Sequence, residues 1–204
     1  MKPVSDPLRA GAPLRGASDA LLIVDLQRDF LPGGALGVSH GYAVVPVLNR
    51  YVKLAAEVGS PVFASRDWHP SDHCSFRARG GPWPDHCVAE TPGAQFAADL
   101  DLPPDVHRID KATRPDADAY SAFDGTGLAE RLRKLGVDRV VIGGLATDYC
   151  VLATVRDALR EGFEVVVLED AVRAVDVHPG DGEAALRAMR EAGATLVRET
   201  QAGA

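Results

Sequence analysis

The chain has 204 residues, of which 46% are hydrophobic and 25% charged, and this suits one globular domain with a full core. The formal net charge of -7 argues against nucleic acid as the main partner, because binding to phosphates needs a basic surface. No run approaches the roughly twenty apolar residues that a membrane-spanning helix needs, so we expect no membrane partner either.

The first 18 residues are rich in Pro, Ala, Gly and Arg and contain no apolar core of a secretory signal. We interpret residues 1–18 as a flexible N-terminal extension and residues 19–200 as one domain. The three cysteines, Cys74, Cys87 and Cys150, are an odd set that makes no disulfide framework, which predicts a cytoplasmic protein with reduced thiols. The number of subunits stays open, so a homo-oligomer fits as well as a monomer.

Buried strands and amphipathic helices alternate along the rest of the chain. In chain order, the pattern predicts a strand over 20–25, a helix over 42–58, strands over 61–65 and 106–111, a helix over 128–135, a strand over 139–142, a helix over 148–160, a strand over 164–168, a helix over 181–191 and a strand over 195–197. This alternation predicts a single three-layer α/β/α domain with a six-stranded, mostly parallel, Rossmann-like sheet.

Polar residues stand at the ends of the predicted strands. Asp25 ends the first strand, Asp67 and His69 follow the second, Lys111 ends the third, and Cys150 follows the fourth. In open parallel sheets the ligand crevice lies at the carboxyl ends of the strands, so we expect these side chains to meet there.

Cys150 is the candidate nucleophile. We expect a helix capped by Thr147 to begin beside it, where free N–H groups and the helix dipole lower the pKa of a thiol and can hold a developing oxyanion. Asp25 would accept the thiol proton, and Lys111 would keep Asp25 ionised. Each residue alone also fits a plainer role, as a small core residue, a turn cap and a solvated cation respectively, so only their convergence favours catalysis.

The long segment 67–96 carries the candidate metal ligands. Asp67 and His69 are two apart on extended backbone and can face the same way, while His86 comes from the far side of the loop. Three ligands with open positions indicate a catalytic site for one divalent ion, for which zinc is our first choice and iron or manganese also fits. His73 is either a fourth ligand, a support for one, or a substrate contact.

Other metal sites are disfavoured. A structural zinc site built on Cys74 and Cys87 would need a ligand spacing that matches no standard pattern. The remaining histidines, His40, His107 and His178, show no partner pattern and are assigned no role.

Several segments together resemble the nicotinamidases of the isochorismatase-like cysteine hydrolases. They are DLQRDF at 25–30, DWHP at 67–70, WPDHCV at 83–88, TPGA at 91–94, Lys111, YSAF at 120–123 and GLATDYC at 144–150. The resemblance runs from about Leu21 to near the C-terminus, and the metal segment is its most specific part.

The resemblance implies the isochorismatase-like fold and the hydrolysis of nicotinamide to nicotinate and ammonia through a cysteine thioester, a step of NAD salvage, with pyrazinamide as a second substrate. Asp25, Lys111 and Cys150 match the catalytic triad of the family, and Asp67, His69 and His86 match its metal ligands. It further implies a cis Leu145–Ala146 bond, an oxyanion hole from the N–H groups of Ala146 and Cys150, a metal contact to the pyridine nitrogen, and aromatic walls. The walls would be Phe30, Trp83 and Tyr120.

The sequence departs from the nicotinamidase pattern at two positions, and two alternative functions stay open. Some relatives carry a histidine ligand six residues beyond the first, whereas His73 follows His69 by four, and Ala122 stands where glycine is common. The first alternative is another cysteine hydrolase of this fold, which would act on a different small amide, a carbamoyl compound or a vinyl ether. The second is a non-catalytic binding or thiol-redox protein.

Overall fold

The computed structural model describes residues 13–198, and their strands form one parallel sheet in the order β3-β2-β1-β4-β5-β6. The strands are β1 (Asp19–Val24), β2 (Val62–Asp67), β3 (His107–Lys111), β4 (Arg139–Leu145), β5 (Glu164–Arg173) and β6 (Thr195–Val197). The predicted six-stranded α/β fold is confirmed, and the sheet is parallel throughout. β4 and β5 run beyond their predicted ends at 142 and 168.

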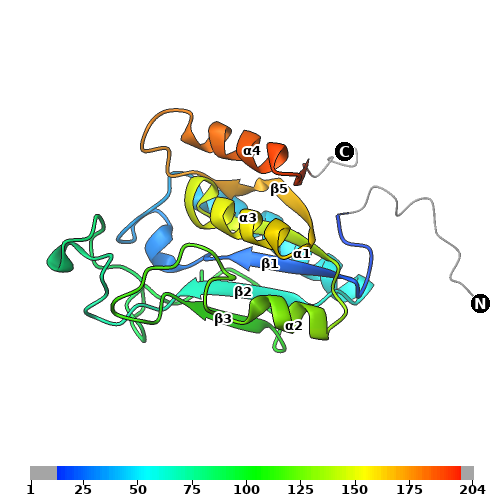
Figure 1. Ribbon diagram of the computed structural model, residues 1–204, viewed down its shortest axis with the longest axis horizontal. Coiled ribbons are helices and arrows are strands. Elements are labelled where there is room, and N and C mark those ends of the chain that lie inside the picture. Colours follow the sequence, from blue (N-terminus) through cyan, green and yellow to red (C-terminus); the bar gives the residue numbers. More distant parts are fainter. Residues whose placement is uncertain (1–12, 199–204) are drawn as a thin grey trace, which may run out of the picture.

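Helices cover both faces of this sheet (Figure 1). Leu21 and Ile23 of β1 pack in the core cluster that contains the buried side of α1 (Val45–Val58). Leu22 and Val24 point to the other face, in a second core cluster with the remaining helices. Those helices are α2 (Leu128–Lys134), α3 (Leu152–Arg160) and α4 (Asp181–Glu191). Because alternate residues of β1 serve two cores, the whole strand is apolar after Asp19.

The strand order reverses between β1 and β4, which makes their carboxyl ends the switch point where ligands bind in such sheets. Asp25 follows β1 there, and Cys150 lies in the π-helical turn η5 (Thr147–Val151) after β4. Gly144 lets the two strands approach, because a Cβ at this position would collide with the Val24 carbonyl oxygen. The Leu145–Ala146 peptide is cis, as the resemblance implies.

The predicted helix cap at Thr147 is wrong. The N-cap residue is Ala146, and no side chain donates or accepts the capping hydrogen bond. Thr147 is buried as the first residue of η5. The sequence pattern could not reveal this, because β4 continues three residues past its predicted end and the chain then winds as a π-turn before α3 begins.

Long connections gather at the carboxyl end of the sheet, where the arrowheads of β1, β2 and β3 point (Figure 1). The segments 68–106 and 112–127 contain only the short 3₁₀ turn η4 (Arg77–Arg79) as helix. The 25–44 connection contains the 3₁₀ turns η2 (Arg28–Phe30) and η3 (Gly41–Val44). These three segments supply most of the walls of the site.

The predicted extension over 1–18 is described only in part. Residues 1–12 lie outside the described residues, whereas Leu14 is buried in the α1 core and the Pro13 carbonyl accepts a hydrogen bond from Arg139. The domain boundary at residue 19 stays a prediction. Among the helices of residues 13–198, none has the length and apolar character needed to cross a membrane.

Candidate active site

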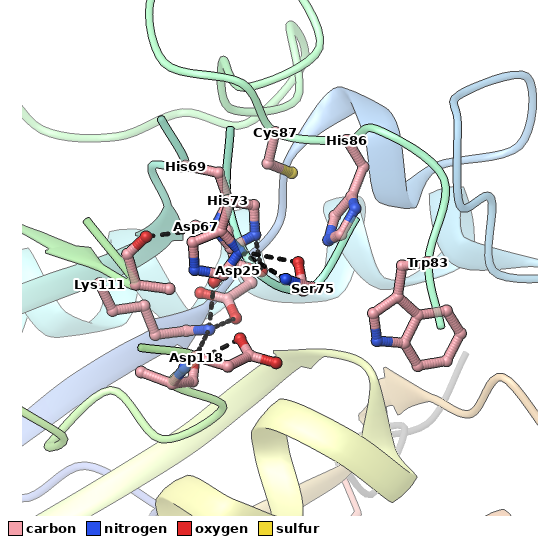
Figure 2. A network of polar contacts seen from close by, with 12 residues as sticks. Asp25, Asp67, His69, His73, Ser75, Trp83, His86, Cys87, Lys111 and Asp118 are labelled. Carbon is pink, nitrogen blue, oxygen red and sulfur yellow. Dashed lines mark hydrogen bonds and ion pairs between the residues drawn. The ribbon is translucent and has the colours of Figure 1, made fainter. Parts of the chain in front are cut away.

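Lys111 stands at the centre of the buried polar cluster formed by the strand ends (Figure 2). Its Nζ lies 3.0 Å from Asp25 Oδ2 and 3.5 Å from Cys150 Sγ, donates to the Ala119 carbonyl oxygen at 2.9 Å, and pairs closely with Asp67 Oδ1. Ser65 of β2 donates to Asp25 Oδ1 at 2.7 Å, which fixes the carboxylate. The predicted convergence of Asp25, Lys111 and Cys150 therefore occurs.

Burial controls the ionisation of this cluster. Burial raises the pKa of the Cys150 thiol well above its usual value, and the Lys111 ammonium offsets only part of that effect. The sequence-based expectation of a lowered thiol pKa is therefore wrong. Burial likewise raises the pKa of Asp25 against the opposing effect of Lys111. Burial alone would lower the pKa of Lys111. The charges of Asp25 and Asp67 outweigh burial and raise this pKa well above its usual value, so the amine is an ammonium.

Asp67, His69 and His86 form the second cluster, as predicted. One ligand atom from each residue lies within 4.8 Å of the others, and all three residues are buried. Asp67 ends β2, His69 continues it through a parallel bridge to Val88, and His86 comes from the returning chain. Burial raises the pKa of Asp67, but Lys111 and His69 outweigh it, so the net pKa falls below its usual value and the group is an anion.

Both histidines of this cluster have one ring nitrogen free for a ligand role. His69 Nδ1 lies 3.2 Å from the Ala112 carbonyl oxygen and His86 Nδ1 lies 2.8 Å from that of Pro84. Since a carbonyl only accepts, each Nδ1 carries a proton, so a neutral ring would offer the lone pair of its Nε2 to a metal. His69 Nε2 is buried without a hydrogen-bond partner among the described residues. This donor set fits zinc.

His73 is not part of the metal group. Its Nε2 lies 3.2 Å from the Ala117 carbonyl oxygen, and its Nδ1 accepts from the N–H of Ser75 and lies 2.8 Å from Ser75 Oγ. Both nitrogens are thus engaged, and the ring stacks on His69 with centroids 4.1 Å apart. Of the three roles left open for His73, the structure favours support of a ligand.

Four further sulfur and imidazole groups belong to neither candidate metal group, although Cys87 lies close to His86 (Figure 2). Cys87 is buried and Cys74 half-buried, and neither joins a candidate metal group within residues 13–198. His107 stacks on Phe63, and His178 faces Asp181 at 3.4 Å.

A cavity of about 300 Å³ opens onto both clusters. Asp67, His86, Ala146 and Cys150 contribute to its lining. The expected aromatic residues Phe30, Trp83 and Tyr120 also line it, and Trp83 Nε1 donates to the Tyr120 hydroxyl at 3.1 Å across its rim. Its volume and largely apolar lining suit a small aromatic ligand.

The sequence pattern missed several lining and supporting residues. Tyr149, Leu36, Val38 and Val175 also line the cavity. Gln27 supports Asp67: its Oε1 accepts the Asp67 N–H and its Nε2 donates to the Asp67 carbonyl, both at 2.8 Å. Gln27 lies in the DLQRDF segment, which was the available signal, but its partner is 40 residues away in sequence.

Comparisons with known proteins agree with this geometry. A nicotinamidase of Escherichia coli is 41% identical over 198 residues, covering 87% of this chain and 93% of the relative. A nicotinamidase/pyrazinamidase of Mycobacterium tuberculosis is 40% identical over 192 residues, covering 87% and 97%. The crystal structure of a pyrazinamidase of Pyrococcus horikoshii in complex with zinc superposes with a TM-score of 0.86 at 53% identity, covering 89% of this chain and 99% of that one. The profile of the isochorismatase domain matches residues 19–201, and the chain therefore belongs to the isochorismatase family.

Proposed function

We propose that this protein is a metal-dependent nicotinamidase, which hydrolyses nicotinamide to nicotinate and ammonia and also accepts pyrazinamide. One observation carries the proposal: a buried Cys–Lys–Asp cluster and a buried Asp–His–His cluster open onto the same small apolar cavity. The nicotinamidases and the zinc-bound pyrazinamidase among the relatives support the same substrate class.

Asp67, His69 and His86 would hold the metal ion, with zinc as first choice and iron or manganese compatible with the same ligands. A bound ion supplies a Lewis-acidic contact for the pyridine nitrogen of the substrate. The Nδ1–H groups of His69 and His86 donate to carbonyl oxygens, which keeps both rings oriented for this task. The aromatic side chains of Phe30, Trp83 and Tyr120 would bind the faces and edge of the ring.

Cys150 would attack the carboxamide carbon. Because burial raises the pKa of the thiol, the resting group is a thiol, and its proton passes to Asp25 as the C–S bond forms. Asp25 then gives this proton to the leaving nitrogen, so that ammonia departs and a thioester remains. The raised pKa of Asp25 makes it a stronger base than an ordinary carboxylate.

Hydrolysis of the thioester completes the cycle. Asp25 takes a proton from water, the resulting hydroxide attacks the acyl carbon, and the sulfur leaves with the proton to restore the thiol. In both halves the oxyanion would be held by the N–H groups of Ala146 and Cys150, which lie at the end of β4 and within η5. The Lys111 ammonium stabilises the negative charge that moves between sulfur and carboxylate.

All groups in this mechanism come from one chain, so it operates equally in a monomer or a homo-oligomer. We propose a cytoplasmic location, which the free state of Cys74, Cys87 and Cys150 supports. The alternative is a related hydrolase that acts on another amide or a carbamoyl compound. It gives no role to the buried group of Asp67, His69 and His86. A non-catalytic binding or thiol-redox protein would give no role to the buried cluster of Asp25, Lys111 and Cys150.

The decisive experiment measures ammonia release from nicotinamide together with the metal content of the same sample. We expect turnover with one bound ion per chain, loss of turnover on chelation, and recovery when zinc is restored. Cys150→Ala serves as the matched control, because it should keep the metal and lose turnover. Turnover that persists in the fully metal-free protein, or no turnover of nicotinamide by the loaded protein, would contradict the proposal.

A further inference from the structure

A second set of metal-ligating atoms lies beside the first. One ligand atom each from Asp25, Asp67 and Cys150 lies within 4.8 Å of the others, and all three residues are buried. Asp67 belongs to both this set and the one with His69 and His86. A metal ion bound to Asp67 could therefore occupy either of two neighbouring sites. Only the site with His69 and His86 leaves the Cys150 nucleophile free.

The chemistry of the second set suits a divalent cation. Two carboxylates and a thiolate are strong ligands for zinc, and donors about 2.0–2.3 Å from one zinc ion lie roughly 3.3–3.8 Å apart. Small movements of these side chains would reach that spacing. Asp25 is fully buried, and its Oδ2 has an ion pair with Lys111 but no hydrogen bond within the described part of the chain.

The ammonium group of Lys111 already lies between the three ligand atoms of this second set. Its Nζ is 3.0 Å from Asp25 Oδ2, 3.5 Å from Cys150 Sγ and in close contact with Asp67 Oδ1. The ammonium is also anchored by the Ala119 carbonyl oxygen at 2.9 Å, and it has no lone pair to offer a metal. A divalent ion could bind all three ligands only by displacing a buried positive charge.

We propose that Lys111 excludes metal ions from the nucleophile. The ammonium offsets part of the negative charge of Asp25 and Asp67, repels a second cation, and so confines the metal to Asp67, His69 and His86. A Cys150 thiolate bound to zinc would be unavailable for attack, which gives the exclusion a functional meaning. The inference rests on the proposed metal site, but its test involves no substrate.

The test replaces Lys111 by methionine, which keeps the length of the side chain and removes its charge. Metal-free wild-type and Lys111→Met proteins are titrated with Co²⁺, and bound metal and near-ultraviolet absorption are recorded, since thiolate ligation of Co²⁺ gives a charge-transfer band. When the S–Co bond forms, the thiol proton leaves to the buffer. Lys53→Met, an exposed position on α1, is the matched control.

We expect one Co²⁺ per chain and no thiolate band in the wild type and in Lys53→Met. Lys111→Met should bind a second equivalent and show the band, and the double variant Lys111→Met/Cys150→Ser should lose the band. A folded Lys111→Met protein without a thiolate band would overturn the proposal.

The wild type gives an independent arm if Lys111→Met does not fold. Iodoacetamide should alkylate Cys150 at the same rate with one equivalent of Zn²⁺ and with a large excess. A tenfold slower reaction in excess Zn²⁺ would overturn the proposal, because the ammonium would then fail to exclude the ion. A wild type that binds no Co²⁺ would refute the proposed metal site instead, and the band in Lys111→Met would still decide the exclusion.

Discussion

Asp67 and Lys111 form a buried ion pair that connects the two reactive clusters of the cavity. On one side Lys111 reaches Asp25 and Cys150, and on the other Asp67 Oδ2 lies 3.6 Å from His69 Nε2. The ligand group and the nucleophile therefore share a charge network. A substitution of Asp67 should therefore alter both metal binding and the reactivity of Cys150, whereas a substitution of His86 should alter metal binding alone.

We predict that Asp67→Asn and His86→Ala separate these effects. Loss of a residue that only supports a metal ligand weakens binding about 10–100-fold, so loss of a ligand itself should weaken zinc binding by more than about a hundredfold in both variants. Only Asp67→Asn also removes a charge beside Lys111, so only it should change the alkylation rate of Cys150 in metal-free protein. Chelator competition and iodoacetamide kinetics measure the two effects, and equal alkylation rates in both variants would contradict the shared network.

Asp25→Asn should give a folded protein with strongly reduced turnover. Asparagine keeps an oxygen that can accept the hydrogen bond from Ser65, but it cannot take up the Cys150 proton. We expect kcat to fall by about 10²–10⁴-fold, which is the usual contribution of a general base, and thiol alkylation to slow as well. The conservative Ser65→Ala change is the comparison, because it leaves the carboxylate in place. Alkylation as fast as in the wild type would mean that Asp25 does not activate the thiol.

The sequence predicted the part of the site that is fixed by strand ends. Asp25, Asp67, Lys111 and Cys150 each stand at or just beyond the carboxyl end of a parallel strand, so the topology alone brings them together. His86 does not stand at a strand end, and its position depends on how the 68–106 connection folds back beside His69. It was therefore predicted from its place in the 67–96 segment and not from the topology of the sheet.

The parts that the sequence did not predict depend on contacts between distant loops. Val175 lines the cavity because Asp148 holds its backbone, and the Cys87 N–H donates to Asp29 across 58 residues. The expected pKa of the Cys150 thiol was wrong for a related reason. Proximity to a helix start is visible in the sequence, but the burial that outweighs it is not. Local patterns carry neither kind of information.

Acid should destabilise the metal-free protein through its buried histidines. Burial lowers the pKa of His86 and of His73. Below the unfolded value of about 6.5, the unfolded chain therefore binds protons that the folded chain does not, so stability falls as the pH drops through this window and is recovered as it rises. Urea unfolding between pH 5 and about 7.5 measures the slope. His86→Gln should flatten this slope, and a slope equal to that of the wild type would contradict the assignment.

Trp83 and Tyr120 should act as a coupled pair at the rim of the cavity. Trp83→Phe and Tyr120→Phe each remove the one hydrogen bond between them while keeping an aromatic ring. We expect either variant to raise KM for nicotinamide severalfold, and the double variant to be no worse than the poorer single one, because both singles lose the same contact. Steady-state kinetics on all four proteins gives the coupling energy. Fully additive effects would mean that the hydrogen bond has no part in binding.

Asp148 should position one wall of the cavity without touching the reaction. Its two carboxylate oxygens accept the N–H groups of Val175 and Asp176, each at 2.9 Å, and so attach the segment after β5 to the turn that carries Cys150. Hydrogen bonds to a charged group contribute about 1.5–3 kcal/mol each, so Asp148→Ala should release this segment. We expect KM to rise about tenfold or more, as one such bond would allow, with the alkylation rate of Cys150 nearly unchanged. Asp116→Ala, at an exposed position, is the control, and a fall in kcat with unchanged KM would show that Asp148 acts on the nucleophile rather than on the wall.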